Sequence, residues 1–80
     1  MNKSLWKLNQ GEQGFITSYD DTLAESYRVR LMELGFHPGE QVTCLQALAF
    51  GAPKVYRVAN TIFSLDDEVA SHIQVTGTFA

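Results

Sequence analysis

The stretch MELGFHPGEQV, residues 32–42, combines a helix end, a chain reversal and a strand start in one short segment. Gly35 can adopt the left-handed backbone that closes a helix, because it has no Cβ to clash. Phe36 can then fold back onto the last helical turn, as often happens after such a cap. Pro38 cannot extend a helix, and with Gly39 it forms a typical turn pair. The segment therefore predicts a helix that stops at Gly35 and a strand that follows directly.

Upstream of this stop, apolar residues recur every three or four positions and so share one helical face. They are Leu23, Tyr27, Leu31 and Leu34. Thr22 and Glu25 have the spacing of a capping box, in which each side chain bonds the other residue's backbone N–H. Arg28 lies three positions after Glu25 and can pair with its carboxylate. We expect one helix over residues 22–34.

The remaining segments are short and rich in β-branched and aromatic residues, which is typical of strands. The expected strands cover residues 14–19, 40–48, 54–59, 61–65 and 73–77. In the second strand, alternation predicts one face with Val42, Cys44 and Leu48 and another with Thr43, Leu45 and Ala47. Residues 49–53 are expected to form a hairpin loop. Residues 66–71 begin with acids suited to a helix N-terminus, so a short helical turn is expected there.

Five short strands, one sizeable helix and one helical turn predict a mainly β fold, a small β-barrel. A chain of 80 residues is long enough for one domain, and we expect a single domain over residues 1–80. Closure of a barrel would also leave few exposed strand edges, which suits such a short chain.

Charge and composition limit the kinds of partner that the chain can bind. The formal net charge is −3 and the Lys and Arg residues are scattered, so a nucleic-acid backbone has little to bind. Cys44 is the only cysteine, which fits a reducing compartment such as the cytoplasm. No secretory signal and no apolar run long enough to cross a bilayer is visible. We expect no direct membrane insertion, and any role at a membrane would go through a partner.

The sequence predicts neither a metal site nor an active site. The borderline ligands are Cys44, His37 and His72, but they lack the compact spacing of a closed zinc site. Cys44 is expected to be a small buried hydrophobic residue and His37 to lie at a solvated turn. Cys44 with His72 is the one nucleophile–base pair worth naming, and nothing places the two together. No Gly-rich phosphate loop is present, so we expect no enzyme, no bound cofactor and no GTP site in this chain.

Protein binding is the role that remains. Arginines supplied to a partner can stabilise phosphoryl transfer, and Arg28, Arg30 and Arg57 could do so. Surface ion pairing or packing of the arginine stems is the favoured explanation for them. Some apolar residues lie off the predicted core faces, and a cluster of them would mark an interface. The predicted partner-binding residues are Arg28, Met32, Leu45 and Phe50.

Several motifs occur in a fixed order along the whole chain: a Leu-x-x-Leu-x-x-Gly opening, the helix stop, a Gly-x-Pro hairpin and a closing apolar pattern. Their residues are Leu5, Leu8, Gly11, Ile16, Arg30, Leu31, Leu34, Gly35, Pro38, Gly39, Gly51, Pro53, Leu65, Ala70, Ile73 and Val75. Taken together, these motifs make the chain resemble the FeoA family, ferrous iron transport protein A. The residues expected to maintain the fold in this resemblance are Arg30, Leu31, Leu34, Gly35, Pro38, Gly39, Leu65 and Ala70. One position departs from the family pattern, since Asp66 stands where an Arg is common.

The resemblance implies an SH3-like barrel with a helix inserted after the first strand. It also implies a small cytoplasmic accessory protein of a bacterial ferrous iron uptake system. The implied partner is the membrane transporter, through its cytoplasmic GTP-binding domain, which would bring the chain to the inner face of the cytoplasmic membrane. The alternative is an iron-binding sensor or delivery module that uses Cys44, His37 or His72. The docking surface, the direction of regulation and the oligomeric state are left open.

Overall fold

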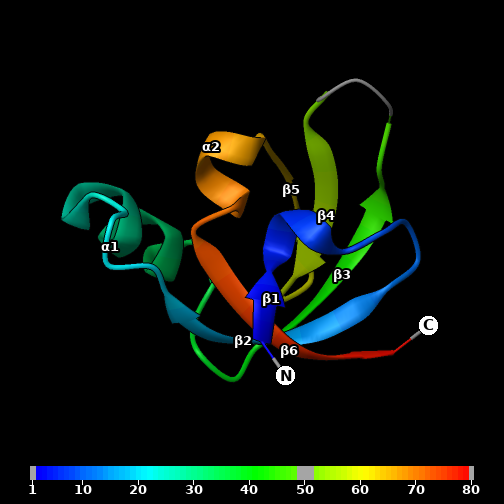
Figure 1. Cartoon of the computed structure of the whole chain (residues 1–80), viewed down its shortest axis with the longest axis horizontal. Coiled ribbons are helices and arrows are strands. Elements are labelled where there is room, and N and C mark those ends of the chain that lie inside the picture. The colour runs from blue at the N-terminus through cyan, green and yellow to red at the C-terminus, as the bar shows by residue number, and fades with distance from the viewer. Residues whose placement is uncertain (1, 49–51, 80) are drawn as a thin grey trace.

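A computed structural model describes residues 2–48 and 52–79 of the chain. Within these residues, six strands form one antiparallel sheet in the order β1-β6-β2-β3-β4-β5 (Figure 1). The strands are β1 (Asn2–Ser4), β2 (Gln13–Tyr19), β3 (Gln41–Gln46), β4 (Lys54–Val58), β5 (Thr61–Leu65) and β6 (Ile73–Phe79). The helices are the 3₁₀ helix η1 (Leu5–Lys7), α1 (Glu25–Glu33) and α2 (Asp67–Ala70).

The mainly β fold is confirmed, and so are all five predicted strands and the short helical turn before the last strand. The first strand, β1, was not predicted, because three polar residues carry no alternation signal. The sheet curls without closing, since β1 and β5 lie at its two ends and are not paired with each other. The helices η1 and α2 each follow one of these end strands and contact each other (Figure 1). The predicted loop over residues 49–53 falls largely outside the described residues.

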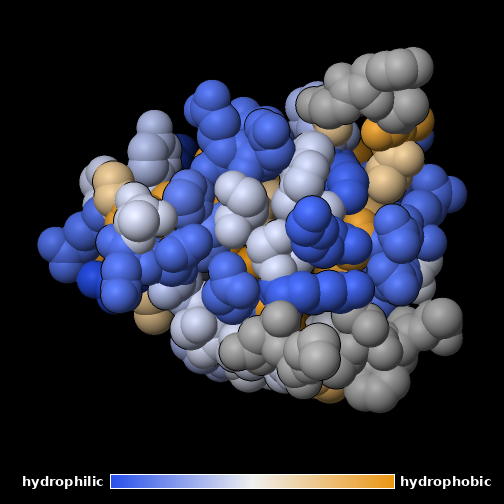
Figure 2. Space-filling view, in the orientation of Figure 1, coloured by the Kyte–Doolittle hydropathy of each residue, from blue (hydrophilic) through white to orange (hydrophobic). Residues whose placement is uncertain are grey.

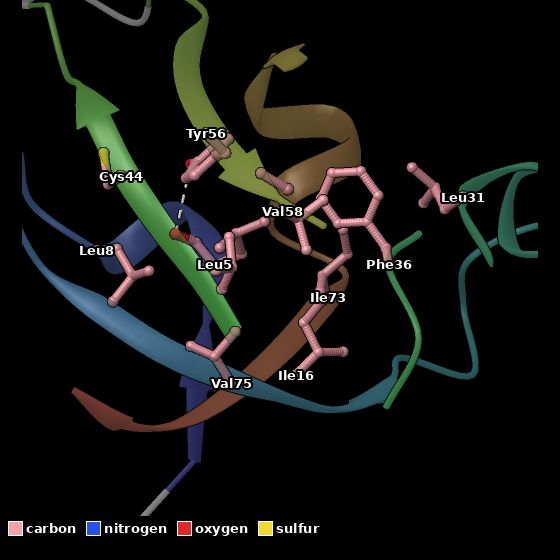
Figure 3. Packing of buried hydrophobic residues seen from close by; sticks show 12 residues of the cluster. Leu5, Leu8, Ile16, Leu31, Phe36, Cys44, Tyr56, Val58, Ile73 and Val75 are labelled. Atoms are coloured by element: carbon pink, nitrogen blue, oxygen red, sulfur yellow. Dashed lines mark hydrogen bonds between the residues drawn. The ribbon is translucent and has the colours of Figure 1, made fainter. Parts of the chain in front are cut away.

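The core lies inside the curled sheet and collects side chains from most elements (Figure 3). Its buried members are Leu5, Leu8, Ile16, Leu31, Phe36, Val42, Cys44, Tyr56, Val58, Ala70, Ile73 and Val75. The hydroxyl of Tyr56 donates to the Leu5 carbonyl at 3.4 Å, so the largest of these side chains has a partner for its polar atom. The Phe36 and Phe63 rings lie 5.0 Å apart in a tilted arrangement, a geometry that aromatic pairs prefer.

The predicted alternation in β3 is correct only as far as Cys44. Val42 and Cys44 are buried, but Leu48 is 56% exposed and lies beyond the end of the strand. The pairing with β4 shifts register between Cys44 and Gln46. Such a bulge inserts one extra residue and reverses which side chains point inward. Ala47 therefore packs against the core, whereas the prediction had placed it on the opposite face.

The predicted N-terminal capping box of α1 is wrong. The helix begins at Glu25, its N-cap is Ala24, and no side chain caps its first turn. The hydroxyl of Thr22 instead lies 3.2 Å from Nδ1 of His72, a residue far along the sequence. A tertiary contact has therefore replaced the local one. The predicted pair of Glu25 with Arg28 is confirmed at 2.9 Å.

The C-terminus of α1 ends as the sequence predicts. Gly35 has φ of +113°, its N–H donates to the Met32 carbonyl, and the Phe36 N–H donates to the Leu31 carbonyl. These two bonds form a Schellman motif, which satisfies carbonyls that the helix end would otherwise leave unpaired. Phe36 is fully buried in the same core cluster as Leu31, which belongs to the last turns of the helix.

Two long-range contacts that the sequence did not reveal fix the loops. The Tyr19 hydroxyl donates to the carbonyl of Phe36, which ties the helix end to β2. The Lys54 ammonium donates to the carbonyls of Trp6 and Leu8 and lies 4.7 Å from the centroid of the Trp6 ring. Both contacts join residues at least 17 positions apart, so no local pattern could have indicated them.

Candidate functional site

The turn after α1 is architecture and leaves its histidine on the surface. The N–H of Glu40 donates to the carbonyl of His37 at 3.0 Å, which makes residues 37–40 a turn. Gly39 has φ of +93°, and its N–H donates to the Ile16 carbonyl at 2.6 Å. These bonds attach the turn to β2. The His37 side chain is exposed, as predicted.

Cys44 is buried in the core, as predicted for a small hydrophobic residue. Its thiol lies 3.8 Å from the Gln46 carbonyl. Burial raises the pKa of the Cys44 thiol, and the positive charge of Lys54 partly offsets that effect. A thiol of this kind is protonated near neutral pH, and thiolate is the form that attacks substrates or binds metals.

His72 lies at a different place, beside the segment that leads into α1. Its Nδ1 is 3.4 Å from a carboxylate oxygen of Asp20, and the Asp20 N–H donates to the His72 carbonyl at 2.8 Å. Together with the Thr22 contact, these bonds hold the loop before α1 against the start of β6. His72 therefore has a structural partner, and its side chain bonds residues of this loop, whereas the Cys44 thiol bonds the end of β3.

The residues that could ligate a metal do not gather. Among residues 2–48 and 52–79, no three His, Cys, Asp or Glu side chains come together in an arrangement that could hold an ion. The acids that open α2 have another use, since the Asp66 carboxylate accepts from the Val69 N–H at 3.3 Å and caps that helix. This local role accounts for an acid at the position where the family pattern often has Arg.

The structure distributes the predicted partner-binding residues over two regions. Arg28 and Met32 lie one turn apart on α1, and Arg28 is ion-paired with Glu25. Leu45 is half-buried in the second half of β3, a segment separated from α1 in Figure 1. Phe50 lies outside the described residues. Among the three described positions, Leu45 therefore lies apart from Arg28 and Met32.

Most predicted motif residues have clear structural roles. Leu31 and Ala70 are buried, and Leu65 packs against the core. Leu34 caps the helix through its backbone, while its side chain is 41% exposed. Arg30 is exposed on α1, and no ion pair or side-chain hydrogen bond to another described residue is found for it. Its place among the residues expected to maintain the fold therefore stays a prediction.

The helix α1 and its C-cap leave three large apolar side chains exposed to solvent. Leu31 is its one buried residue, whereas Tyr27, Val29 and Leu34 are each more than 40% exposed. The sequence placed Tyr27 and Leu34 on the same face as Leu31, and periodicity alone could not show that this face is only partly covered. Tyr27 and Leu34 lie on the same side of the helix as Leu31, whereas Val29 lies on the opposite side, next to Met32. Exposed large apolar side chains of this kind can contact a partner.

A groove lies between the start of α1 and α2, with a volume of about 470 Å³. Its lining residues are Thr22, Leu23, Ala24 and Tyr27 on one side and Asp66, Glu68, Val69 and His72 on the other. A neighbouring hollow shares Leu23 and extends along Asp20, Asp21 and the Glu25–Arg28 pair. Sequence reasoning missed this groove, because its two walls lie about half the chain apart and only the fold brings them together.

Tyr19 lines the same neighbouring hollow. Burial raises the pKa of Tyr19 to about 12, and the nearby charge of Arg28 opposes that shift. The Tyr19 hydroxyl therefore stays protonated and keeps donating to the Phe36 carbonyl over the whole physiological pH range.

In the described residues, no helix is both long and apolar enough to cross a membrane.

Comparisons with known proteins agree with this fold. The sequence profile of the FeoA domain matches residues 3–77, whereas a search of curated protein sequences found no match. A solved structure of FeoA from Stenotrophomonas maltophilia, complexed with zinc, is 29% identical and superposes with a TM-score of 0.81, covering 91% of this chain and 88% of that one. It is described as an SH3-domain protein and a suggested activating factor for bacterial ferrous iron transport.

Two further structures extend the comparison. FeoA from Chlorobium tepidum is 25% identical, with a TM-score of 0.80 and coverage of 90% of this chain and 67% of that one. A manganese-dependent transcriptional repressor bound to manganese has a TM-score of 0.83 at 16% identity, over 94% of this chain but 36% of the repressor. The repressor shows a shared fold only. The predicted SH3-like fold is thereby confirmed, as a curled sheet that does not close.

Proposed function

The chain belongs to the FeoA domain family, and from this membership we propose that it is an accessory protein of bacterial ferrous iron uptake. It acts by docking on the cytoplasmic GTP-binding domain of the membrane transporter. The observation that carries the proposal is the family match over residues 3–77, almost the entire chain. The FeoA of S. maltophilia, described as a suggested activating factor of ferrous iron transport, supports the same role.

The surface of α1 is the proposed docking region. Arg28 and Met32 lie there, and the same helix exposes Tyr27, Val29 and Leu34. A helix that buries only one of its own side chains leaves apolar area for a partner to cover. Leu45 and Phe50 remain proposed contacts of a second region. Docking of this kind places the protein in the cytoplasm, at the inner face of the membrane.

The alternative, direct iron binding, requires Cys44, His37 or His72 to act as ligands. His37 is exposed on a turn and His72 is bonded to Asp20, while Cys44 is inside the core. An anaerobic titration with ferrous iron tests this alternative. Micromolar, stoichiometric binding that is lost on replacing these residues would favour it over docking.

The docking proposal is tested by a pull-down with the transporter's purified cytoplasmic GTP-binding domain, with and without GTP. We expect capture of the wild-type chain in at least one nucleotide state. The Val29→Asp change on α1 should reduce capture, since it puts a charge into an apolar contact. Ile62→Asp is the matched control, because Ile62 is also exposed but lies on β5. No capture in either nucleotide state would contradict the proposal.

A further inference from the structure

The groove between α1 and α2 has an apolar lining. Leu23 and Val69 pack against the core and, with Ala24 and Tyr27, line the groove. Tyr27 is 56% exposed, so its side chain remains available to a ligand. The volume of the groove, about 470 Å³, is within the range of protein binding clefts. An apolar side chain that entered here would be removed from water, which favours binding.

Carboxylates lie in this groove and next to it, since Asp66 and Glu68 line the groove and three further acids line the neighbouring hollow. Of the nine acidic residues, six lie on the segments that border the groove, namely Asp20, Asp21, Glu25, Asp66, Asp67 and Glu68. Two of the six are paired, Asp20 with His72 and Glu25 with Arg28. The other four have no ion pair within the described part of the chain. Figure 2 shows hydrophilic side chains over α2.

The cations of the chain lie mostly elsewhere. Lys3, Lys7, Lys54 and Arg57 belong to β1, η1 and β4. A formal net charge of only −3 therefore divides into an acidic end at the two helices and a more basic region on the sheet. An apolar groove with an acidic rim is complementary to an apolar side chain flanked by positive charges.

We propose that this groove binds a cationic amphipathic segment of a partner protein. An apolar side chain of that segment occupies the groove, and flanking Lys or Arg side chains face the carboxylates of the rim. This inference rests on the proposed function for the identity of the partner. Cytoplasmic segments next to membrane-spanning helices carry an excess of Lys and Arg, so the transporter's cytoplasmic part would supply such a segment. The same carboxylates would repel the phosphates of nucleic acids and anionic lipids.

The direct test uses a fluorescently labelled synthetic peptide built from pairs of Leu and Lys, and follows its anisotropy on titration with the full chain. We expect saturable binding that weakens as salt is added, since screening reduces the attraction between exposed charges. A peptide with Glu in place of every Lys is the matched control and should not bind. Equal binding of both peptides would overturn the inference.

Variants locate the binding site on the protein. Glu68→Lys reverses one rim charge and should weaken peptide binding by about fivefold, as expected for one exposed ion pair. Tyr27→Ala removes part of the apolar wall and should weaken binding by about tenfold. The controls are Glu33→Lys, which changes α1 outside the groove, and Ile62→Ala, which shortens an exposed apolar side chain on β5. Each should have less than about a twofold effect. Far-UV circular dichroism confirms that every variant is folded, and equal effects of groove and control variants would contradict the groove.

The same variants separate this inference from the docking proposal. For this comparison the transporter domain includes the cytoplasmic segments next to its membrane-spanning helices. If it captures wild type and the Glu68→Lys and Tyr27→Ala variants equally, docking stands but does not use the groove, which overturns the inference. If the peptide binds in the groove but the transporter domain is never captured, the groove's preference for cationic segments is supported and the proposed partner is wrong.

Discussion

The two α-helices of this fold differ in their N-terminal capping and in the share of their residues that is buried. The short helix α2 is capped at its N-terminus by the Asp66 carboxylate and buries Ala70 completely. The longer helix α1 has no side-chain cap at its N-terminus and buries only Leu31. A longer helix usually gains stability from a buried apolar face, because most helical stability in proteins comes from packing. The difference indicates that much of the α1 surface is not used for folding, which leaves it for a partner.

The substitution with the largest expected effect tests whether burial of Leu31 is the main contact that holds α1 against the core. Leu31→Ala should lower the free energy of unfolding by about 2–5 kcal/mol, because it removes buried methyl groups and leaves a cavity. Val29→Ala, on the same helix but 47% exposed, should change it by less than about 0.5 kcal/mol. Urea denaturation of both variants measures the two values. Similar losses would mean that α1 is held by its whole surface, and the contrast with α2 would disappear.

The substitution with the next largest expected effect changes the C-terminal cap of α1, the second feature that stabilises this helix. A β-branched residue at Gly35 must adopt φ of +113°, and its Cβ would lie 3.2 Å from the Cβ of Ala59. We expect Gly35→Val to lower the free energy of unfolding by more than about 1 kcal/mol. Gly39→Val is the matched control, because Gly39 also has positive φ but its added Cβ would meet no atom within 4 Å. Gly35→Val should therefore be the more destabilising of the two, and unchanged melting would contradict the cap.

Comparison of the two ends of α1 shows which features the sequence could predict. The C-terminal end depends on neighbouring residues alone, so Gly35 and Phe36 were enough to predict a left-handed glycine cap, which the structure shows as a Schellman motif. At the N-terminal end, Thr22 had the right spacing to cap the helix locally. Its hydroxyl bonds His72 instead, 50 positions away, and no local pattern contains that information.

The same distinction applies to the sheet and to the groove. The alternation of β3 predicted the burial of Val42 and Cys44, but not the bulge that follows, since a bulge depends on pairing with β4. The groove needs Leu23 and Val69 on facing walls, and only the curl of the sheet brings these residues together. Local chemistry thus predicted the elements of this fold, whereas the candidate site is a product of their packing.

The substitution with the smallest expected effect gives α1 an N-terminal side-chain cap, which α2 already has. Ala24 occupies the N-cap position of α1 with a non-helical backbone, φ of −58° and ψ of 139°, and a serine hydroxyl at an N-cap can accept from the first free N–H groups of a helix. Ala24→Ser should therefore raise the free energy of unfolding by roughly 0.5–1 kcal/mol. The reverse change on α2, Asp66→Ala, removes an existing cap and should lower it by roughly 0.5–2 kcal/mol.

Thermal melting followed by circular dichroism measures both cap variants, with Ser26→Ala as a control inside α1. Ala24→Ser should raise the melting temperature because four N–H groups at the start of any helix lack intrahelical partners, and a hydroxyl satisfies one of them. If Ala24→Ser leaves the melting temperature unchanged while Asp66→Ala lowers it, the first turn of α1 frays whether or not it is capped. The stability of α1 would then depend mainly on its later turns, through the burial of Leu31 and the cap at Gly35.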